Sequence, residues 1–307
     1  MTVAQKLQTI QKLLHLTQTQ LAERIGVSFV TLNRWKLDKV VPRASMLAKI
    51  EDLYLEVTGQ KVIPLERLVA KKKALSRRAS HHRNVVKEIV SHPDLRDQFV
   101  LTLTYNTNRM EGSTLSELDT AAILFENLAL PNKSLTEHLE AKNHQAALLY
   151  IFEHILTRQE ISEDFVLKLH SILMNGIWPD AGLYRRHGVR IVGVNLPTAN
   201  FLKIPDLIPV VMEEATMKTK DAIHQCTTTH ARLEQIHPFS DGNGRVGRLL
   251  MTAMLLKANM PPAIIKQEQR QLYNTYLFKA QTRDDASQLE DFICDAIEEG
   301  YNVLERK

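Results

Sequence analysis

The feature that most constrains the fold is a polar, glycine-containing loop, residues 237–248, which lies between two apolar segments. Ala231, Leu233 and Ile236 precede the loop, and an almost uninterrupted apolar run, residues 249–256, follows it. Apolar runs of this kind are typical of buried helices. The sequence therefore predicts two core helices joined by a short loop that gathers several polar side chains in one place.

The glycines and arginines of this loop suit a phosphate site. Gly242 and Gly244 let the backbone turn so that several N–H groups point into one concavity at a helix start, and such a concavity attracts anions. Arg245 and Arg248 are three residues apart on the following helix. Both guanidinium groups can therefore bind one polyphosphate.

Two further residues of the loop indicate chemistry at that phosphate. His237 can accept a proton near neutral pH, and Asp241 offers the hard oxygen that Mg²⁺ prefers beside phosphate oxygens. Each residue alone has a plainer interpretation, since a histidine before proline usually lies in a core and Gly-Asn-Gly is usually a turn. It is the combination that indicates a nucleotide-phosphate site with a base and a metal.

The loop, His237 to Arg248, closely resembles the signature of the Fic family, His-Pro-Phe-x-(Asp/Glu)-Gly-Asn-Gly-Arg-x-x-Arg, and every fixed position is met. The resemblance implies a protein adenylyltransferase that moves AMP from ATP to a Ser, Thr or Tyr hydroxyl of a protein, either another protein or the chain itself. It makes His237 the base and Asp241 the Mg²⁺ ligand. The nucleotide-binding residues that it implies are Gly242, Asn243, Gly244, Arg245 for the β-phosphate and Arg248 for the γ-phosphate.

A second motif lies upstream, where residues 107–112 resemble the inhibitory helix of the family, (Ser/Thr)-x-x-x-Glu-(Gly/Asn). Thr107 and Glu111 share one helical face, and Gly112 ends the helix, which we expect near residues 99–111. The resemblance implies that Glu111 pairs with Arg248 and blocks the productive pose of the γ-phosphate. It also implies that Glu111 could position water for removal of AMP, a second activity.

Residues 182–200 resemble the flap of the family, a β-hairpin that aligns the target by strand addition. The alternation of Val189, Ile191 and Gly193 itself indicates a strand. Downstream of the loop, Tyr273 and Tyr276 stand where family members place aromatic residues near the adenine. Helix core is an equally good interpretation of these two tyrosines.

The N-terminal 60 residues resemble a Cro/C1-type helix-turn-helix. Leu21, Ile25 and Leu32 are spaced as two helices crossing at a tight turn require, with Gly26 in the turn. Exposed apolar residues at the start of the second helix leave protein binding open as an alternative to contact with thymine methyl groups. The residues that we expect to contact double-stranded DNA are Gln18, Ser28, Thr31, Asn33, Arg34 and Lys36.

Charge supports this division, because residues 1–100 carry 18 Lys and Arg against 9 Asp and Glu, a balance of +9, whereas the other residues carry 21 against 26, a balance of −5. A basic N-terminal part suits contact with phosphate backbones. The two cysteines, Cys226 and Cys294, fit reduced and buried thiols in a cytoplasmic protein. No apolar run is long enough to span a membrane, so we expect no membrane partner.

The sequence thus predicts an all-α protein with a small β-hairpin flap: a helix-turn-helix domain at 1–60, a basic connector at 61–84 and a Fic domain at 85–307. We expect a homodimer. A nucleotide-sensing repressor with little catalysis and an enzyme using another nucleotide donor are the alternatives. The helices expected after the connector are 85–111, 116–127, 134–157, 162–175, 206–225, 227–236, 245–259, 269–281 and 287–304.

Overall fold

The structure is a computed structural model, and it describes residues 1–37, 39–190, 196–283 and 285–306. The chain forms two compact units. The first consists of Met1–Pro64 and Glu268–Gln288, and the second of Leu65–Gln267 and Leu289–Lys307. These bounds differ from the expected ones. Residues 65–84 of the expected connector belong to the second unit, and Glu268–Gln288, expected in the Fic domain, belong to the first.

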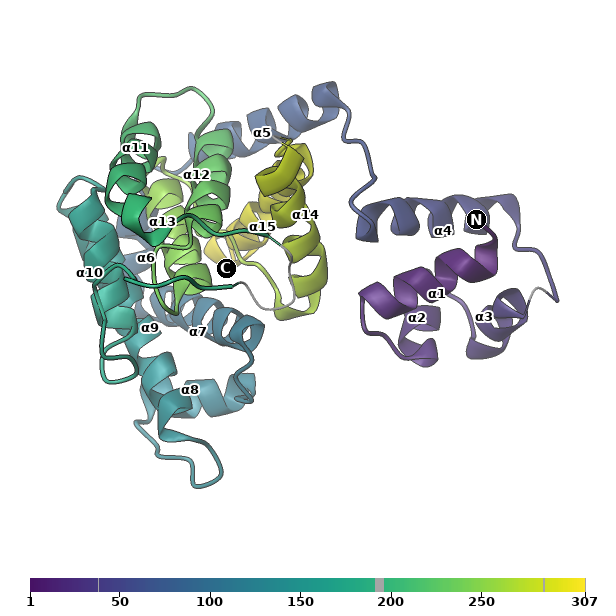
Figure 1. The fold of residues 1–307 in the computed structure, drawn as a ribbon, viewed down its shortest axis with the longest axis horizontal. Coiled ribbons are helices and arrows are strands. Elements are labelled where there is room, and N and C mark those ends of the chain that lie inside the picture. The colour runs from purple at the N-terminus through teal and green to yellow at the C-terminus, as the bar shows by residue number, and fades with distance from the viewer. Residues whose placement is uncertain (38, 191–195, 284, 307) are drawn as a thin grey trace. The chain divides into compact units, whose positions relative to one another are not determined.

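The first unit is helical (Figure 1). Its turns are set by local hydrogen bonds: Ser28 caps a helix by accepting from the Thr31 N–H at 3.2 Å, and Gly26 ends the preceding helix with φ +82°. Leu7, Ile10 and Leu32 are fully buried in the core of this unit. The helices are α1 (Val3–Leu13), α2 (Gln18–Ile25), α3 (Phe29–Lys36), α4 (Ala44–Val57) and α14 (Arg270–Arg283), with a 3-10 turn η2 (Gln267–Gln269) before α14.

The helix α14 contacts α4 within this unit. A Cβ at Gly59 would lie 3.1 Å from the Thr275 methyl carbon, and the Gln288 amide donates to the Lys61 carbonyl. The sequence analysis assigns Glu268–Gln288 to the Fic domain. A single sequence carries no signal for a contact between positions more than 200 residues apart, so it could not predict the packing of α14 against α4.

The second unit contains the remaining helices, and the polar loop joins two of them, α12 and α13, which lie side by side (Figure 1). They are α5 (Leu65–Ala79), α6 (Val85–Ser91), α7 (Pro93–Glu111), α8 (Glu117–Phe125), α9 (Leu135–Leu156), α10 (Glu163–Leu173), η1 (Phe201–Lys203), α11 (Ile204–Thr216), α12 (Ala222–Ile236), α13 (Asn243–Lys257) and α15 (Ser287–Leu304), the last beginning in the first unit.

Two of the expected helices were wrong. The single helix 85–111 is divided at His92, because Pro93 lacks an N–H and forces the residue before it out of helical geometry, here to φ −119° and ψ 100°. The helix 206–225 ends at Thr216, and a new helix begins at Ala222 with the Asp221 side chain as its cap.

The expected basic connector contains a packed helix, α5, and three of its cations form ion pairs within the second unit. Lys71 Nζ lies 2.8 Å from a carboxylate oxygen of Asp291, and Lys72 Nζ lies 2.7 Å from one of Asp221. Arg78 binds Glu305 at 2.7 Å. These contacts give Lys71, Lys72 and Arg78 a structural role within the second unit.

The all-α prediction is confirmed, since the described residues contain helices and loops without a strand. Of the expected flap, Ile191 and Gly193 lie outside the described residues, and Val189 lies in a loop where its carbonyl accepts from the Thr198 hydroxyl at 3.0 Å. Within the described ranges, no helix is both long and apolar enough to cross a membrane. Cys226 and Cys294 are buried free thiols.

Candidate functional site

His237 occupies the end of α12 in a left-handed conformation, with φ 54° and ψ 61°. Its backbone N–H still donates to the Leu233 carbonyl at 2.9 Å, so the residue caps the helix while its side chain turns back over the last turn. The ring Nδ1 lies 3.2 Å from the Glu234 carbonyl oxygen. Because a carbonyl only accepts, Nδ1 carries the proton and Nε2 is the basic nitrogen.

The surroundings of His237 keep its ring neutral. Burial lowers the pKa of the imidazole below its ordinary value, and this outweighs the hydrogen bond to the Glu234 carbonyl, which raises the pKa; the positive charge of Arg185 lowers it further, against smaller opposing effects of Glu111 and Asp241. The side chain is 17% exposed, so the ring is held by its surroundings yet keeps access to solvent. A neutral imidazole at neutral pH is competent to accept a proton.

Arg185 fixes the backbone around His237 and was not singled out from the sequence. Its side chain is buried, and its guanidinium donates to backbone carbonyls rather than to a carboxylate, at 2.7 Å to His237 and 2.6 Å to Ala199. Its own N–H donates to the Pro238 carbonyl at 3.0 Å. The Arg185 side chain thereby ties the loop at residue 199 to the loop that follows α12.

Two other contacts hold the loop in place. The Asn243 amide both accepts from the Phe239 N–H and donates to the Phe239 carbonyl, each at 2.9 Å. The Phe239 ring stacks on His170 with centroids 3.8 Å apart, and His170 Nε2 donates to the Asp241 carbonyl at 3.1 Å. The side chain of Asn243 therefore holds the loop through both its oxygen and its nitrogen.

The start of α13 has the backbone geometry that an anion site needs. Gly242 is its N-cap with φ +79°, and a Cβ there would lie 2.8 Å from the Met174 sulfur. Both the backbone conformation and the lack of space therefore favour glycine. The first-turn N–H groups of a helix have no acceptor inside the helix and carry its positive dipole end. A Cβ at Gly244 would lie 2.7 Å from Glu111 Oε1, so a carboxylate already stands at this site.

The two arginines of the loop have different partners. Arg245 is buried and donates to Glu140 Oε1 at 2.7 Å, and its NH2 group lies 3.5 Å from Asp241 Oδ2. Burial raises the pKa of Glu140, although the charge of Arg245 opposes that rise. The Nε atom of Arg245 has no hydrogen-bond partner among the described residues. Arg245 is therefore fixed by an internal ion pair that the sequence did not reveal.

Arg248 reaches the helix α7 instead. Its Nε donates to the Thr107 hydroxyl at 2.7 Å, and its NH2 group forms a direct ion pair with Glu111 Oε1. Thr107 is buried, whereas the Glu111 side chain is 36% exposed. The structure thus contains the ion pair that the resemblance implied, and it joins the end of α7 to the phosphate site.

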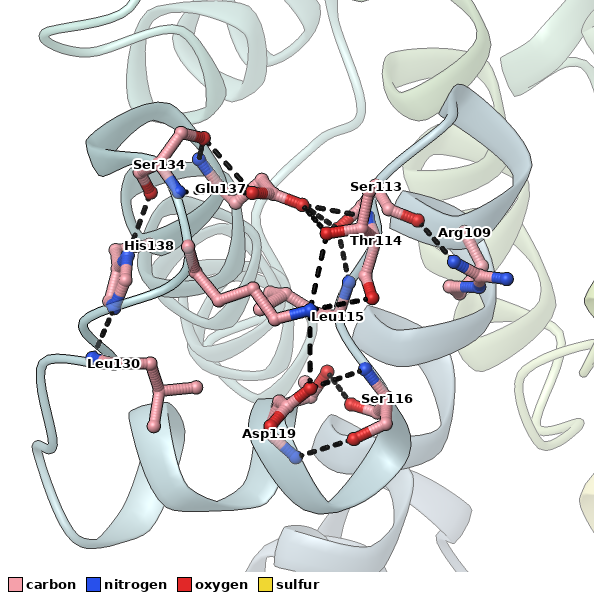
Figure 2. Close-up of polar contacts among 12 residues, drawn as sticks. Arg109, Ser113, Thr114, Leu115, Ser116, Asp119, Leu130, Ser134, Glu137 and His138 are labelled. Atoms are coloured by element: carbon pink, nitrogen blue, oxygen red, sulfur yellow. Dashed lines mark hydrogen bonds and ion pairs between the residues drawn. The ribbon is translucent and has the colours of Figure 1, made fainter.

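A cluster of hydrogen bonds around Glu137 fixes the chain just after Glu111 (Figure 2). Glu137 accepts from the Thr114 N–H at 2.7 Å and its hydroxyl at 2.8 Å, and also from the Ser134 N–H at 3.1 Å. Burial opposes ionisation, but the bonds from Thr114 and Ser134 outweigh it and lower the pKa of Glu137 to about 2. We call this group of residues the Glu137 cluster.

The Glu137 cluster extends to both sides. Lys133 Nζ donates to the Thr114 carbonyl at 2.9 Å and lies 3.5 Å from Asp119, while Arg109 donates to the Ser113 carbonyl at 2.6 Å (Figure 2). Gly112 ends α7 in a left-handed conformation, and the cluster ties the chain after it to the start of α9. The position of the Glu111 carboxylate depends on that end.

The only carboxylate that the resemblance assigns to a metal is Asp241. Its side chain is 54% exposed, and its Oδ1 accepts from the Gly242 N–H at 2.7 Å. No group of three or more His, Cys, Asp or Glu side chains arranged to hold a metal occurs in the described part of the chain. Mg²⁺ commonly binds one or two carboxylates together with substrate phosphates, and an exposed Asp241 beside an anion site fits that donor set.

The remaining predicted residues lie in the first unit. Ser28 and Thr31 share a hydrogen bond in the N-cap of α3, and Lys36 Nζ donates to the Gln11 side chain at 2.6 Å. The exposed face of α3 carries Phe29, Val30 and Arg34. Asn33 on α3 and Gln18 at the start of α2 are half-buried, and Tyr273 and Tyr276 lie buried on α14, where the adenine contact stays a prediction.

Four residues of the site were missed from the sequence: Arg185, His170, Glu140 and Glu234. Three of them reach the loop from other helices or loops, and no local pattern identifies such a residue. Glu234 alone had a signal, because it lies three residues before His237 on the same helical face.

Comparison with known proteins supports both parts of the sequence interpretation. Residues 160–255 match the Fic/DOC family, and residues 8–55 match the helix-turn-helix family. The chain is 34% identical over 196 residues to protein adenylyltransferase fic-1 of Caenorhabditis briggsae and 31% identical over 207 residues to protein adenylyltransferase Fic of Drosophila erecta. These matches cover 62% and 65% of this chain but 38% and 40% of those relatives, so the chain spans about two fifths of their length.

Solved structures agree on the fold. Fic-1 from C. elegans has a TM-score of 0.67 and 23% identity, covering 92% of this chain and 84% of that one. A Fic domain containing signaling protein from Bacteroides thetaiotaomicron has a TM-score of 0.62 and 20% identity, covering 78% and 97%. The chain therefore carries a Fic/DOC domain preceded by a helix-turn-helix domain.

Proposed function

We propose that this protein is an adenylyltransferase that moves AMP from ATP to a Ser, Thr or Tyr hydroxyl of a protein, its own chain included. The observation that carries the proposal is the loop between α12 and α13. It places a neutral histidine with a defined basic nitrogen beside a helix start that attracts phosphate. The adenylyltransferases named above support the reaction type.

The reaction needs one proton transfer and one exchange at phosphorus. His237 Nε2 takes the proton of the target hydroxyl while that oxygen forms a bond to the α-phosphorus. The bond from the α-phosphorus to the oxygen bridging to the β-phosphate breaks, and pyrophosphate leaves with the electron pair. Positioning and electrostatic stabilisation provide most of the rate in such transfers, and here the N–H groups at the start of α13 and Arg248 provide them.

Mg²⁺ fits this site through Asp241, whose exposed carboxylate stands at the start of α13. Bound there, Mg²⁺ would offset negative charge on the α- and β-phosphates. Arg245 lies 3.5 Å from the same carboxylate and is itself held by Glu140. Arg245 therefore keeps Asp241 oriented and adds positive charge behind the phosphates.

The Glu111–Arg248 ion pair makes the described state an inhibited one. Arg248 is the cation that the γ-phosphate requires. In the structure this cation is paired with the Glu111 carboxylate, which lies beside Gly244. A carboxylate there also repels the incoming phosphate. Activation then requires that Glu111 leave Arg248.

The test is incubation of the full chain with labelled ATP, Mg²⁺ and a cell lysate, followed by mass spectrometry of every labelled band. Wild type, Glu111→Gly and His237→Ala are compared. We expect label in the Glu111→Gly reaction and none with His237→Ala, which lacks the base but keeps the start of α13. Transfer of label by His237→Ala at the rate of its parent contradicts the proposal. A fall of label over time with wild type would reveal removal of AMP.

A second function, binding of double-stranded DNA by a homodimer, is favoured by the match to the helix-turn-helix family. The exposed face of α3 offers Arg34 for phosphates and Phe29 and Val30 for thymine methyl groups. Two copies would read half-sites about one helical turn apart. Selection from a random duplex pool tests this, and recovery of no enriched sequence would contradict it.

A further inference from the structure

Glu234 stands beside the nitrogen of His237 that does not react. It lies one turn earlier on α12, and the left-handed backbone of His237 folds the ring back over that turn. Nδ1 lies 3.2 Å from the Glu234 carbonyl oxygen and 3.9 Å from its carboxylate atom Oε2. When Nε2 takes up a proton, the positive charge spreads to Nδ1, directly beside this carboxylate.

Within the described residues, one oxygen of the Glu234 carboxylate, Oε1, has no hydrogen-bond partner, and the other oxygen faces the His237 ring. The residue is 7% exposed. It packs against α13 where residue 247 is glycine, since a Cβ there would lie 2.9 Å from Glu234 Oε1 and 2.7 Å from His230 Nδ1. A buried carboxylate without a hydrogen bond destabilises a fold, so a role in the reaction is the better explanation.

The charges that face Glu234 come from three helices. Burial raises the pKa of Glu234 to about 7, the charge of Arg248 on α13 lowers it, and the charge of Glu111 on α7 raises it. His230 on α12 is neutral, because burial lowers its pKa to about 3. Glu111 therefore acts on Glu234 in one direction, towards the protonated and uncharged form.

On these grounds we propose that Glu234 is a positioning residue for His237. Its carboxylate stabilises the imidazolium that forms during transfer, and Glu111 weakens that support in the inhibited state. No bond of Glu234 changes in the step: the hydroxyl proton goes to Nε2, and the proton on Nδ1 remains between the ring and residue 234. The proposal rests on the proposed function of His237 as the base.

The inhibitory role of Glu111 then has two parts. It occupies Arg248 and, through its charge, favours the uncharged form of Glu234. Departure of Glu111 frees the phosphate-binding cation and lets Glu234 ionise next to the base at the same time. The two parts are separable, because only the second changes the titration of His237 through residue 234.

The first experiment measures the titration of His237 by NMR in the full-length chain labelled with ¹³C and ¹⁵N at histidine, with His237→Asn to assign the signals. In the Glu111→Gly background, we expect Glu234→Gln to lower the His237 midpoint by about one pH unit, because a carboxylate 4 Å away is lost. In the wild-type background the same change should be smaller, since Glu111 already favours the uncharged carboxyl. Glu153→Gln, which removes an exposed carboxylate from α9, should leave the midpoint unchanged.

The second experiment measures single-turnover transfer against pH in the Glu111→Gly background. Glu234→Gln should lower the rate constant by about tenfold, as expected for a weaker base, and leave the KM for ATP within about twofold. The acidic limb of the pH profile should move to lower pH, and Glu234→Asp should restore it in part. Loss of packing alone would lower the rate without moving that limb.

An unchanged or raised His237 midpoint in Glu234→Gln would overturn the proposal. If that variant fails to fold, Glu234→Asp and Glu234→Asn form a second matched pair, and the charged member must have the higher midpoint. A shifted midpoint together with no AMP transfer in any variant would support the Glu234–His237 interaction and overturn the proposed function instead.

Discussion

Replacement of Glu111 by glycine should activate the enzyme, and the structure sets the size of the effect. The change deletes the carboxylate that Arg248 binds and leaves the bond of Arg248 to Thr107 in place. A hydrogen bond to a charged group contributes about 1.5–3 kcal/mol. Since 1.36 kcal/mol corresponds to about a tenfold change in rate, release of Arg248 should raise AMP transfer about 10- to 150-fold. We expect an increase in the lower half of this range, because the Glu111 side chain is 36% exposed and water partly screens its charge.

The assay is incorporation of labelled AMP by wild type, Glu111→Gly, Arg248→Ala and the double variant at equal ATP and Mg²⁺. Arg248→Ala should not activate, because it removes the partner of the inhibitor and the γ-phosphate ligand together. The double variant should match Arg248→Ala alone, as expected for groups that act as one unit. If Glu111→Gly transfers no faster than wild type, then the end of α7 is only a core helix and the inhibitory interpretation is wrong.

Three other changes test separate parts of the chain. Glu137→Gln should loosen the chain after α7 and raise basal transfer severalfold. In wild type, the hydrogen bonds to Glu137 lower its pKa to about 2, so they should stabilise the fold above pH 4.5 and lose this effect as the pH falls towards 2. Melting curves recorded at several pH values will show that loss. Asp241→Ala should lose Mg²⁺-dependent transfer, and equal activity at the same Mg²⁺ concentration would contradict that assignment. Asn33→Ala should reduce discrimination among duplexes, whereas Arg34→Ala should weaken binding to all of them and flatten its salt dependence, measured by fluorescence anisotropy.

The sequence predicted well what depends on neighbouring residues. The capping residue Ser28 and the turn at Gly26 follow from local backbone requirements, and the structure confirms both. The loop from His237 to Arg248 could also be found, because its residue types and spacing are contiguous. Where the hydrogen bonds of a turn or cap join residues a few positions apart, the local sequence is enough to predict that turn or cap.

The sequence did not reveal contacts that come from elsewhere in the chain. We expect Lys36 at DNA, and the structure shows that its amine donates to Gln11 on α1. We expect Asn243 at the nucleotide, and the structure shows that its side-chain amide binds the Phe239 backbone. A polar side chain in a motif offers the same donors to a ligand and to its own fold, and only the tertiary structure shows which partner is nearer.

The difference between the two arginines of α13 explains why the proposed inhibition would act at one of them. Their spacing makes Arg245 and Arg248 equivalent in the sequence, yet Arg245 is buried with Glu140, an ion pair whose disruption would leave a charge without a partner. Arg248 instead pairs with Glu111, which is partly exposed at the last turn of α7. Separating this second pair returns the carboxylate to water at low cost. The arginine that can change partners is therefore the one that we propose the end of α7 controls, and we expect Arg245 to stay in place when Glu111 leaves.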